Sequence, residues 1–353
     1  MTTVDRMELD TTGQDDIFRL AKGYYSTRAM LAAWRLGFLE RAAAGETLDV
    51  RALGAERGVD PGQVRPLLDY LVIRGFFEKE SADGYRLTER GRAARPFYGY
   101  LSTMVGAYEP VFARIEGLIT GTLAYGKDVS RSHEEMVRGL TALEDRMMGT
   151  VTDAVRDSGG RTVLDLGCGS ARMLSHICAL DPAIRAVGVD RDPESCAVAR
   201  ETVRREGLDG RMTILQGDAG DVAALPADVV SEVDTVTVMF LLHEILRQRG
   251  REGTVQLLRD IAELIGEGGR LVMVEVSGTT EPAYRENLLF VPEYELLHEY
   301  TNQRLAARPE WEAMVADAGM RVVDVLPVNM CQAFCLVATP AGAGADRGAS
   351  DGV

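Results

Sequence analysis

Apolar residues recur at helical spacing through most of the first 95 residues of the chain. The pattern predicts a long helix over residues 17–39, a shorter helix that begins at Leu48 and ends at Gly58, and a third helix that begins at Pro61. Two short apolar segments then flank a turn at residues 82–84, as in a β-hairpin. Together these elements predict a mostly helical, winged-helix-like domain.

From Arg161 onward the pattern changes to apolar runs that alternate with helices. Five runs are expected to be strands: residues 162–166, 186–189, 212–215, 235–240 and 271–276. Their spacing is typical of a parallel sheet with helices on both faces, which is a doubly wound, Rossmann-like α/β domain. The predicted domains are the winged-helix-like domain at 1–95, a helical bridge that lines the substrate cleft at 96–156, the α/β domain at 157–340 and a disordered tail at 341–353.

Composition and charge limit the kinds of molecule that this 353-residue chain is expected to bind. The net charge of −15 at pH 7 disfavours nucleic acids and anionic membranes, so we expect a small-molecule ligand. No segment approaches the roughly 18 apolar residues that span a bilayer, and the N-terminus lacks the segments of a signal peptide. The five cysteines show no paired metal-ligand spacing, which suits a reducing compartment. We therefore expect a cytoplasmic protein.

The helix predicted over residues 17–39 has more apolar surface than one small domain is expected to bury. Leu20, Tyr24 and Trp34 are among its apolar residues. We expect the excess to be buried against a second copy, in a homodimer. A winged-helix pattern also occurs in DNA-binding proteins, but this domain lacks the basic stripe that a duplex requires.

A glycine-rich turn and three acidic residues follow the first three predicted strands. Gly167 and Gly169 form the turn, and Asp190 ends the next strand, where a carboxylate can bind both hydroxyls of a ribose. These two features leave NAD and S-adenosylmethionine both possible. Asp165, just before the turn, would repel a pyrophosphate and suits an ammonium or sulfonium group. Asp218 follows the third strand, where its carboxylate can meet an adenine amino group.

These motifs resemble those of class I methyltransferases, over residues 161–339. With the winged-helix-like region, the chain is similar to dimeric small-molecule methyltransferases. It departs from the pattern at Ala171, where many members have a third glycine. The resemblance implies S-adenosyl-L-methionine as cofactor. The residues that it implies for cofactor binding are Asp165, Gly167, Gly169, Asp190 and Asp218.

Two of the four histidines lie where a substrate is expected. His243 follows the fourth predicted strand, at the carboxyl edge where α/β sheets bind ligands. His298 lies thirteen residues before Trp311. Each histidine is followed by an acidic residue, Glu244 or Glu299.

The pair resembles the two His-acid pairs of metal-dependent 2-oxo acid C-methyltransferases of peptide-antibiotic biosynthesis, which have aspartate where this chain has glutamate. The resemblance implies that His243 and His298 are catalytic and bind iron or zinc with positions open for substrate. A 2-oxo acid can chelate such a metal, so that its C3 proton becomes removable near neutral pH. The C3 carbon then attacks the sulfonium methyl in line. Glu244 or a metal-bound hydroxide is expected to take the proton.

The same residues are also compatible with other activities. The position of His298 also resembles that of a general base in O-methyltransferases, although the loop common after that base is replaced by residues 300–305. N-methylation and a non-catalytic S-adenosylmethionine-binding regulator are further alternatives. Lys127 is a candidate for binding a substrate carboxylate, and a solvated lysine is the alternative.

Overall fold

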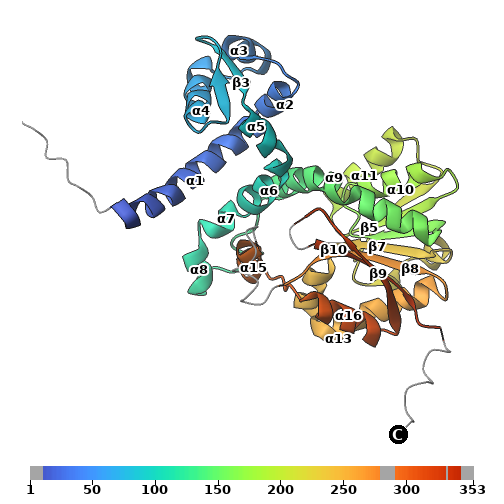
Figure 1. Cartoon of the computed structure of the whole chain (residues 1–353). Coiled ribbons are helices and arrows are strands. Elements are labelled where there is room, and N and C mark those ends of the chain that lie inside the picture. Colours follow the sequence, from blue (N-terminus) through green and yellow to red (C-terminus); the bar gives the residue numbers. More distant parts are fainter. Residues whose placement is uncertain (1–10, 279–290, 331–332, 343–353) are drawn as a thin grey trace, which may run out of the picture. The chain divides into compact units, whose positions relative to one another are not determined.

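Figure 1 shows the computed structural model of the chain, which describes residues 11–278, 291–330 and 333–342. The chain divides into two compact units: Met1–Ala113 with Arg131–Leu143, and Arg114–Ser130 with Glu144–Val353. Residues of the predicted helical bridge occur in both units. Residues 343–353 of the predicted tail lie outside the described residues.

The first unit contains the predicted winged-helix pattern. Its elements are α1 (Thr11–Arg35), α2 (Phe38–Ala43), β1 (Leu48–Asp49), α3 (Val50–Arg57), α4 (Pro61–Ile73), β2 (Phe77–Lys79), β3 (Gly84–Leu87) and α5 (Glu89–Ala94). The strands form a small antiparallel sheet in the order β1-β3-β2. The predicted start of the second helix was wrong, because Leu48 pairs with Tyr85 in this sheet. The helix begins after Asp49, whose carboxylate accepts hydrogen bonds from the N–H groups of Arg51 and Ala52.

The helix predicted over residues 17–39 is two helices. They are separated at Gly37, whose φ of 72° lies in the left-handed region. The expected apolar excess is present on α1, since Leu20 is 72% exposed and Tyr24 is 56% exposed within one chain. The inner part of α1 is packed, with Met30 and Leu31 buried.

Most residues between the winged helix and the α/β sheet are helical. They form η1 (Arg95–Phe97), α6 (Tyr98–Tyr100), the π-helix η2 (Leu101–Ala107), α7 (Glu109–Phe112), α8 (Ile115–Ile119) and the long α9 (His133–Ser158). The candidate Lys127 is exposed in a turn between α8 and α9.

The second unit is built on a seven-stranded sheet in the order β6-β5-β4-β7-β8-β10-β9. Its strands are β4 (Thr162–Leu166), β5 (Arg185–Asp190), β6 (Met212–Gln216), β7 (Thr235–Met239), β8 (Arg270–Val276), β9 (Met320–Pro327) and β10 (Ala333–Pro340). The five predicted strands are present and parallel. The sheet as a whole is mixed, because β9 and β10 form a C-terminal antiparallel pair and β10 is also antiparallel to β8.

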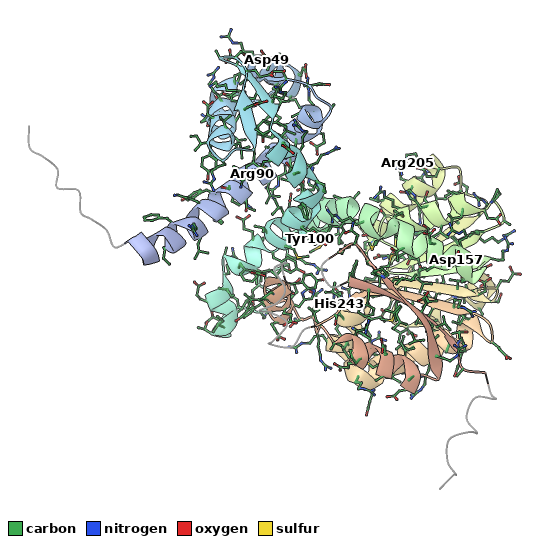
Figure 2. All side chains as sticks on the ribbon, viewed as in Figure 1. Asp49, Arg90, Tyr100, Asp157, Arg205 and His243 are labelled. Atoms are coloured by element: carbon green, nitrogen blue, oxygen red, sulfur yellow. The ribbon has the colours of Figure 1, made fainter. Side chains whose placement is uncertain are left out.

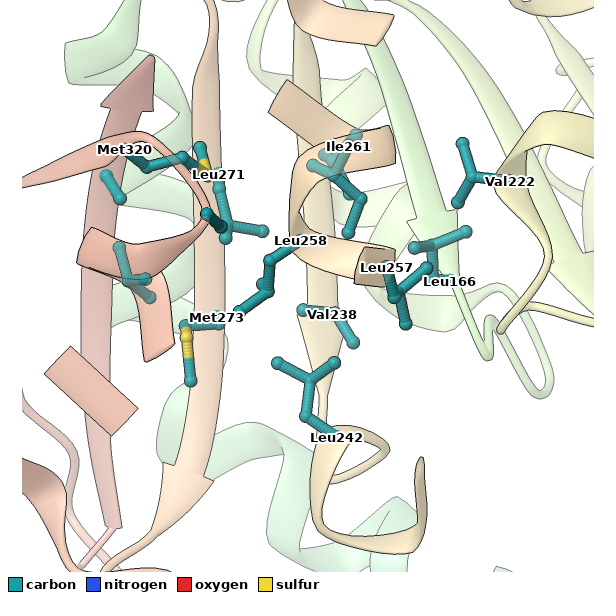
Figure 3. Close-up of a cluster of buried hydrophobic side chains, with 14 of the residues drawn as sticks. Leu166, Val222, Val238, Leu242, Leu257, Leu258, Ile261, Leu271, Met273 and Met320 are labelled. Atoms are coloured by element: carbon teal, nitrogen blue, oxygen red, sulfur yellow. The ribbon is translucent and has the colours of Figure 1, made fainter. Parts of the chain in front are cut away.

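Helices cover both faces of this sheet (Figure 1). They include α10 (Arg172–Leu180), α11 (Pro193–Arg205), α13 (Leu242–Ile265) and α16 (Arg308–Asp317). The unit also contains η3 (Val222–Ala224), α12 (Ala227–Val230) and α15 (Val291–Glu299). Alternate residues of a strand point to opposite faces, so each strand contributes to two cores. Leu271 and Met273 of β8 pack with Leu258 of α13 on one face, as Figure 3 shows. Val272 and Val274 belong to the core on the other face.

The described part of the chain contains no helix that is both long and apolar enough to cross a membrane.

We expect the exposed apolar side chains of α1 to bury themselves in a homodimer. Leu20→Glu should weaken the dimer at least tenfold, because it places a charge where an apolar side chain is buried. Lys22→Glu is a matched control, since it places the same charge at an exposed polar position of α1. Light scattering over a micromolar dilution series measures the effect. A monomeric unmodified chain, or equal weakening by both substitutions, would contradict the assignment of this surface.

Candidate functional site

The predicted cofactor residues lie at the carboxyl ends of β4, β5 and β6, which are adjacent in the sheet. The turn after β4 contains three residues with positive φ: Gly167 at 82°, Gly169 at 51° and Ala171 at 56°. A left-handed conformation costs a residue with a Cβ roughly 1 kcal/mol. Ala171 therefore adopts the conformation for which a third glycine is suited, and α10 begins directly after it.

Asp190 joins the end of β5 to the glycine turn. Its Oδ2 accepts a hydrogen bond from the N–H of Gly169 at 3.0 Å, and its Oδ1 accepts one from the N–H of Asp192 at 2.9 Å. A carboxylate oxygen has more than one acceptor position, so these bonds orient Asp190 and leave capacity for ribose hydroxyls.

Asp165 is enclosed within β4. Its Oδ1 accepts a hydrogen bond from Thr237 Oγ1 at 2.7 Å, and its Oδ2 is buried without a partner in the described part of the chain. Burial raises the pKa of Asp165 to about 7, and the charges of Glu144 and Asp190 also raise it. An ammonium or sulfonium group would supply the missing counter-charge, which fits the expected cofactor.

Asp218 lies in the loop after β6 and has an ion pair that the sequence analysis did not predict. Its Oδ2 is 2.8 Å from a guanidinium nitrogen of Arg249 in α13, and its Oδ1 accepts a hydrogen bond from the N–H of Gly220. The carboxylate is largely exposed, with 59% of the side chain accessible. Arg249 also donates to the carbonyl of Gly220, so it orients the loop that is proposed to bind adenine.

His243 lies in the first turn of α13, just beyond the carboxyl end of β7, and Figure 2 marks its position. Its Nδ1 is 2.8 Å from Oε2 of Glu275, and both side chains are buried. The other oxygen of Glu275 accepts hydrogen bonds from the N–H groups of Leu242 and His243, at 2.9 and 3.3 Å. Because a carboxylate accepts hydrogen bonds, we assign the proton of the neutral ring to Nδ1 and its lone pair to Nε2.

His298, in α15, lies beside His243. The two ring centroids are 5.2 Å apart, with an angle of 72° between the rings. His298 is buried, and its Nδ1 is 2.6 Å from the carbonyl oxygen of Tyr294, one helical turn earlier. The carbonyl can only accept, so this ring also carries its proton on Nδ1. The structure therefore brings the two predicted histidines together with the same tautomer.

Gln303 completes the cluster. Its buried amide nitrogen is 3.3 Å from Nε2 of His243 and 2.8 Å from Oε1 of Glu244. The amide oxygen of Gln303 is 3.1 Å from the hydroxyl of Thr301. Glu244 is also 3.9 Å from a guanidinium nitrogen of Arg191. A single hydrogen-bonded chain thus runs from Glu275 through His243 and Gln303 to Glu244.

The backbone of Gln303 and Arg304 is hydrogen-bonded to both segments that contain the histidines. The N–H of Gln303 donates to the carbonyl of His298, and the N–H of Arg304 donates to the carbonyl of His243, both at 3.2 Å. Asn302, with a φ of 55°, makes the turn that allows both bonds. Asparagine tolerates this conformation better than most residues.

The sequence analysis missed Glu275 and Gln303. Glu275 is a fully buried acid within the otherwise apolar run 271–276 of β8, and that interruption of the pattern was a signal for a functional role. Gln303 gave no comparable signal. Of the two acids that follow the histidines, Glu244 joins the cluster, whereas Glu299 is exposed.

No group of three or more His, Cys, Asp or Glu side chains is placed to hold a metal among residues 11–278, 291–330 and 333–342. The two histidines nevertheless fit a metal by their chemistry. Metal-binding histidines usually donate their other ring N–H to a carboxylate or a backbone carbonyl. Glu275 and the carbonyl of Tyr294 accept in this way, so Nε2 is the ring atom through which each histidine would bind a metal.

Two models of known families match the chain, and both agree with the fold. A methyltransferase domain model matches residues 163–269, and an O-methyltransferase dimerisation domain model matches residues 18–94. The chain is an S-adenosylmethionine-dependent methyltransferase. The predicted fold, with a helical N-terminal dimerisation region before a Rossmann-like domain, is confirmed, and the dimerisation match supports the predicted homodimer.

Individual relatives of this methyltransferase differ in what they modify. The 2-ketoarginine methyltransferase of Streptomyces arginensis is 28% identical over 87% of this chain and 86% of its own length. The phenazine-1-carboxylate N-methyltransferase of Pseudomonas aeruginosa is 26% identical over 74% of this chain and 78% of its own length. The structure of the mitomycin 7-O-methyltransferase MmcR has the same fold, with a TM-score of 0.69 at 20% identity, over 93% of this chain and 98% of that one.

Asp165 should make the cofactor-free methyltransferase less stable as the pH rises. Its pKa in the folded chain, about 7, lies above the unfolded value of 3.8, so the folded chain holds the proton more tightly between these values. The free energy of unfolding should therefore fall by up to about 4 kcal/mol from pH 4 to pH 7. Urea unfolding should show that Asp165→Asn removes this fall, whereas the exposed Asp228→Asn keeps it. An unchanged slope in Asp165→Asn would contradict the burial of a titrating carboxyl.

Glu275→Gln should disable the enzyme without unfolding it. The amide oxygen can still accept from the backbone, but an amide N–H facing Nδ1 would move the ring proton of His243 to Nε2. We expect kcat to fall about 10- to 100-fold, the range seen when partners of functional histidines are lost. The exposed Glu267→Gln is the matched control, with circular dichroism as the test of folding. Full activity of Glu275→Gln would show that this hydrogen bond does not orient the site.

Proposed function

We propose that this methyltransferase transfers the methyl group of S-adenosylmethionine to C3 of a 2-oxo acid, in secondary metabolism, at a metal site made by His243 and His298. The observation that carries the proposal is a pair of adjacent buried histidines, each with Nδ1 beside a hydrogen-bond acceptor. Each ring uses Nδ1 as a donor, to Glu275 or to the carbonyl of Tyr294, which leaves Nε2 as the ligating atom. When bound, iron or zinc would supply a Lewis acid that stabilises negative charge on the keto oxygen of the substrate.

One relative supports the same substrate class. By its name, the Streptomyces arginensis relative methylates 2-ketoarginine, which is a 2-oxo acid, and the match extends over most of both chains. It includes the regions of both histidines because only about an eighth of this chain lies outside it.

The cofactor is proposed to lie along the carboxyl edge of the sheet. Asp218 after β6 would bind the adenine amino group, and Asp190 at the end of β5 would bind the ribose hydroxyls. The glycine turn, Gly167 and Gly169, lies at the end of β4, next to β7 and His243 in the strand order. The sulfonium methyl would therefore face the histidine cluster, with Asp165 beneath the positively charged end.

The chain supplies the groups for proton removal and alignment. Glu244, whose carboxylate belongs to the histidine cluster, is proposed to accept the C3 proton. The electron pair left on C3 then forms the bond to the methyl carbon, and the bond from that carbon to sulfur breaks. The products are the C3-methylated 2-oxo acid and S-adenosylhomocysteine, so atoms and charges balance.

Methylation of oxygen or nitrogen is the second candidate. Relatives with these activities occur, such as the 3-amino-4-hydroxybenzoate 4-O-methyltransferase of Streptomyces cremeus, 27% identical over 75% of this chain and 74% of its own length. Their mechanism would need a general base. His298 was the expected base, but the hydrogen bond to Glu275 gives His243 the geometry of a carboxylate-oriented base, so His243 is the better candidate for this route.

The two routes predict different results for metal removal. If the metal site is correct, dialysis against a chelator should reduce turnover of 2-oxo acids at least 100-fold and zinc or iron should restore it. His243→Ala and His298→Ala should each lose the metal by elemental analysis, whereas His176→Ala, on α10, should retain it. The measurement pairs metal content with mass spectrometry of the methylated product.

A set of possible methyl acceptors distinguishes C-methylation from O- and N-methylation. Aliphatic and aromatic 2-oxo acids are compared with phenols and aromatic amines, using methyl-labelled cofactor. Label at C3 of an oxo acid supports the proposal. Chelator-resistant transfer to a phenol, dependent on His243 alone, would overturn it in favour of O-methylation.

A further inference from the structure

We propose that Arg172 and Glu144 bind the amino-acid end of S-adenosylmethionine. The guanidinium group of Arg172 faces the carboxylate of the cofactor, and the carboxylate of Glu144 faces its ammonium group. Arg172 is the first residue of α10, directly after the glycine turn, and Glu144 lies in α9. The inference rests on the proposed cofactor site and adds two residues that the sequence analysis did not identify.

The two side chains form an ion pair with each other. A guanidinium nitrogen of Arg172 is 3.3 Å from Oε2 of Glu144. This distance exceeds the roughly 2.7–2.9 Å of a strong charge-assisted hydrogen bond. The side chains are 30% and 21% exposed, and an ion pair in contact with water stabilises a fold only slightly. The pair can therefore separate when the two charges of a ligand become available to it.

Glu144 belongs to a group of acids around the carboxyl end of β4. Burial raises the pKa of Asp165 to about 7, and the charges of Glu144 and Asp190 also raise it, so these carboxyl groups are close enough to interact. Oδ2 of Asp165 is buried without a partner among the described residues. A positive group beside Asp165 and Glu144 would relieve the repulsion between them. The ammonium group of the cofactor is suited to this side of the ion pair.

The start of α10 favours a negative charge. Alanine has no side-chain acceptor, so Ala171 at the N-cap position leaves the first N–H groups of the helix without a side-chain cap. The positive end of the helix dipole and the guanidinium group of Arg172 act at the same place, and both attract a carboxylate. Because an α-amino acid carries its ammonium and carboxylate groups on one carbon, the pair of Arg172 and Glu144 is complementary to it.

The test is calorimetric titration of the full-length protein with three ligands that share adenosine. S-adenosylhomocysteine has both charged groups of the amino-acid end, decarboxylated S-adenosylmethionine lacks the carboxylate, and 5′-methylthioadenosine lacks the whole amino-acid end. Arg172→Met should weaken binding of S-adenosylhomocysteine about tenfold and leave the other two affinities within about twofold, because only the first ligand has a carboxylate. Glu144→Gln should weaken both ligands that have an ammonium group about tenfold, and leave 5′-methylthioadenosine within about twofold.

Two further variants serve as controls. Arg161→Met removes a different ion pair, with Asp181, that joins the residue before β4 to the residue after α10. It should leave all three affinities unchanged. Arg172→Lys keeps the positive charge without the two-pronged geometry of the guanidinium, so its affinity for S-adenosylhomocysteine should lie between those of Arg172→Met and the unmodified protein.

The ligand series separates a binding role from a structural one. Equal losses for all three ligands in both variants would show that the ion pair supports the fold of the site, and would overturn the inference. Unchanged binding of S-adenosylhomocysteine by both variants would also overturn it. In either case the proposed cofactor site stands, because the unmodified protein binds the ligand. If the folded, unmodified protein binds none of the three ligands, the inference and the proposed cofactor site are overturned together.

Discussion

The buried hydrogen bond between His243 and Glu275 is the interaction on which the rest of the site depends. Glu275 is fully buried, and its carboxylate accepts hydrogen bonds from the ring of His243 and from the first two N–H groups of α13. It therefore fixes the start of the helix, the orientation of the ring and the position of the ring proton with one side chain. The proposed metal site and the competing base mechanism both follow from the lone pair that this bond leaves on Nε2.

On the cofactor side of the site, the buried carboxyl group of Asp165 limits which ligands can bind. Asp165 has one carboxylate oxygen that is unpartnered among the described residues, and its burial, followed by the charges of Glu144 and Asp190, raises its pKa. The empty protein therefore has an excess of negative charge where the positively charged end of S-adenosylmethionine is expected. Burial of the carboxylate disfavours its charged form, so cofactor binding should draw part of its free energy from supplying the counter-charge. The same charge would repel the pyrophosphate of a dinucleotide.

The spacing of apolar residues predicted most of the fold, because the period of a helix or a strand follows from interactions between residues that are close in the sequence. The five parallel strands were found as apolar runs, since strands buried on both faces need apolar residues throughout. Strands β9 and β10 were not predicted, although β10 is an apolar run of the same kind. Their antiparallel pairing with each other and with β8 is a tertiary contact that no local pattern reveals. The long N-terminal helix was extended too far because Gly37, which separates α1 from α2, is a single residue within an apolar pattern.

The site was predicted less completely for the same reason. His243 and His298 were identified by their position relative to the predicted elements, and the structure places their rings side by side. Their partners Glu275 and Gln303 come from other segments, and only the folded chain shows which carboxylate faces which ring nitrogen. The ion pair of Asp218 with Arg249 was hidden likewise, because α13 brings a residue 31 positions away to the cofactor loop.

The most direct test of the account is X-ray absorption at the zinc edge of the zinc-loaded protein. The account predicts scattering from two imidazole rings bound to the metal, and from one ring in the His298→Ala variant if that variant is loaded with excess zinc. Bound zinc without imidazole scattering in the unmodified protein, or an unchanged spectrum in both His243→Ala and His298→Ala, would contradict it.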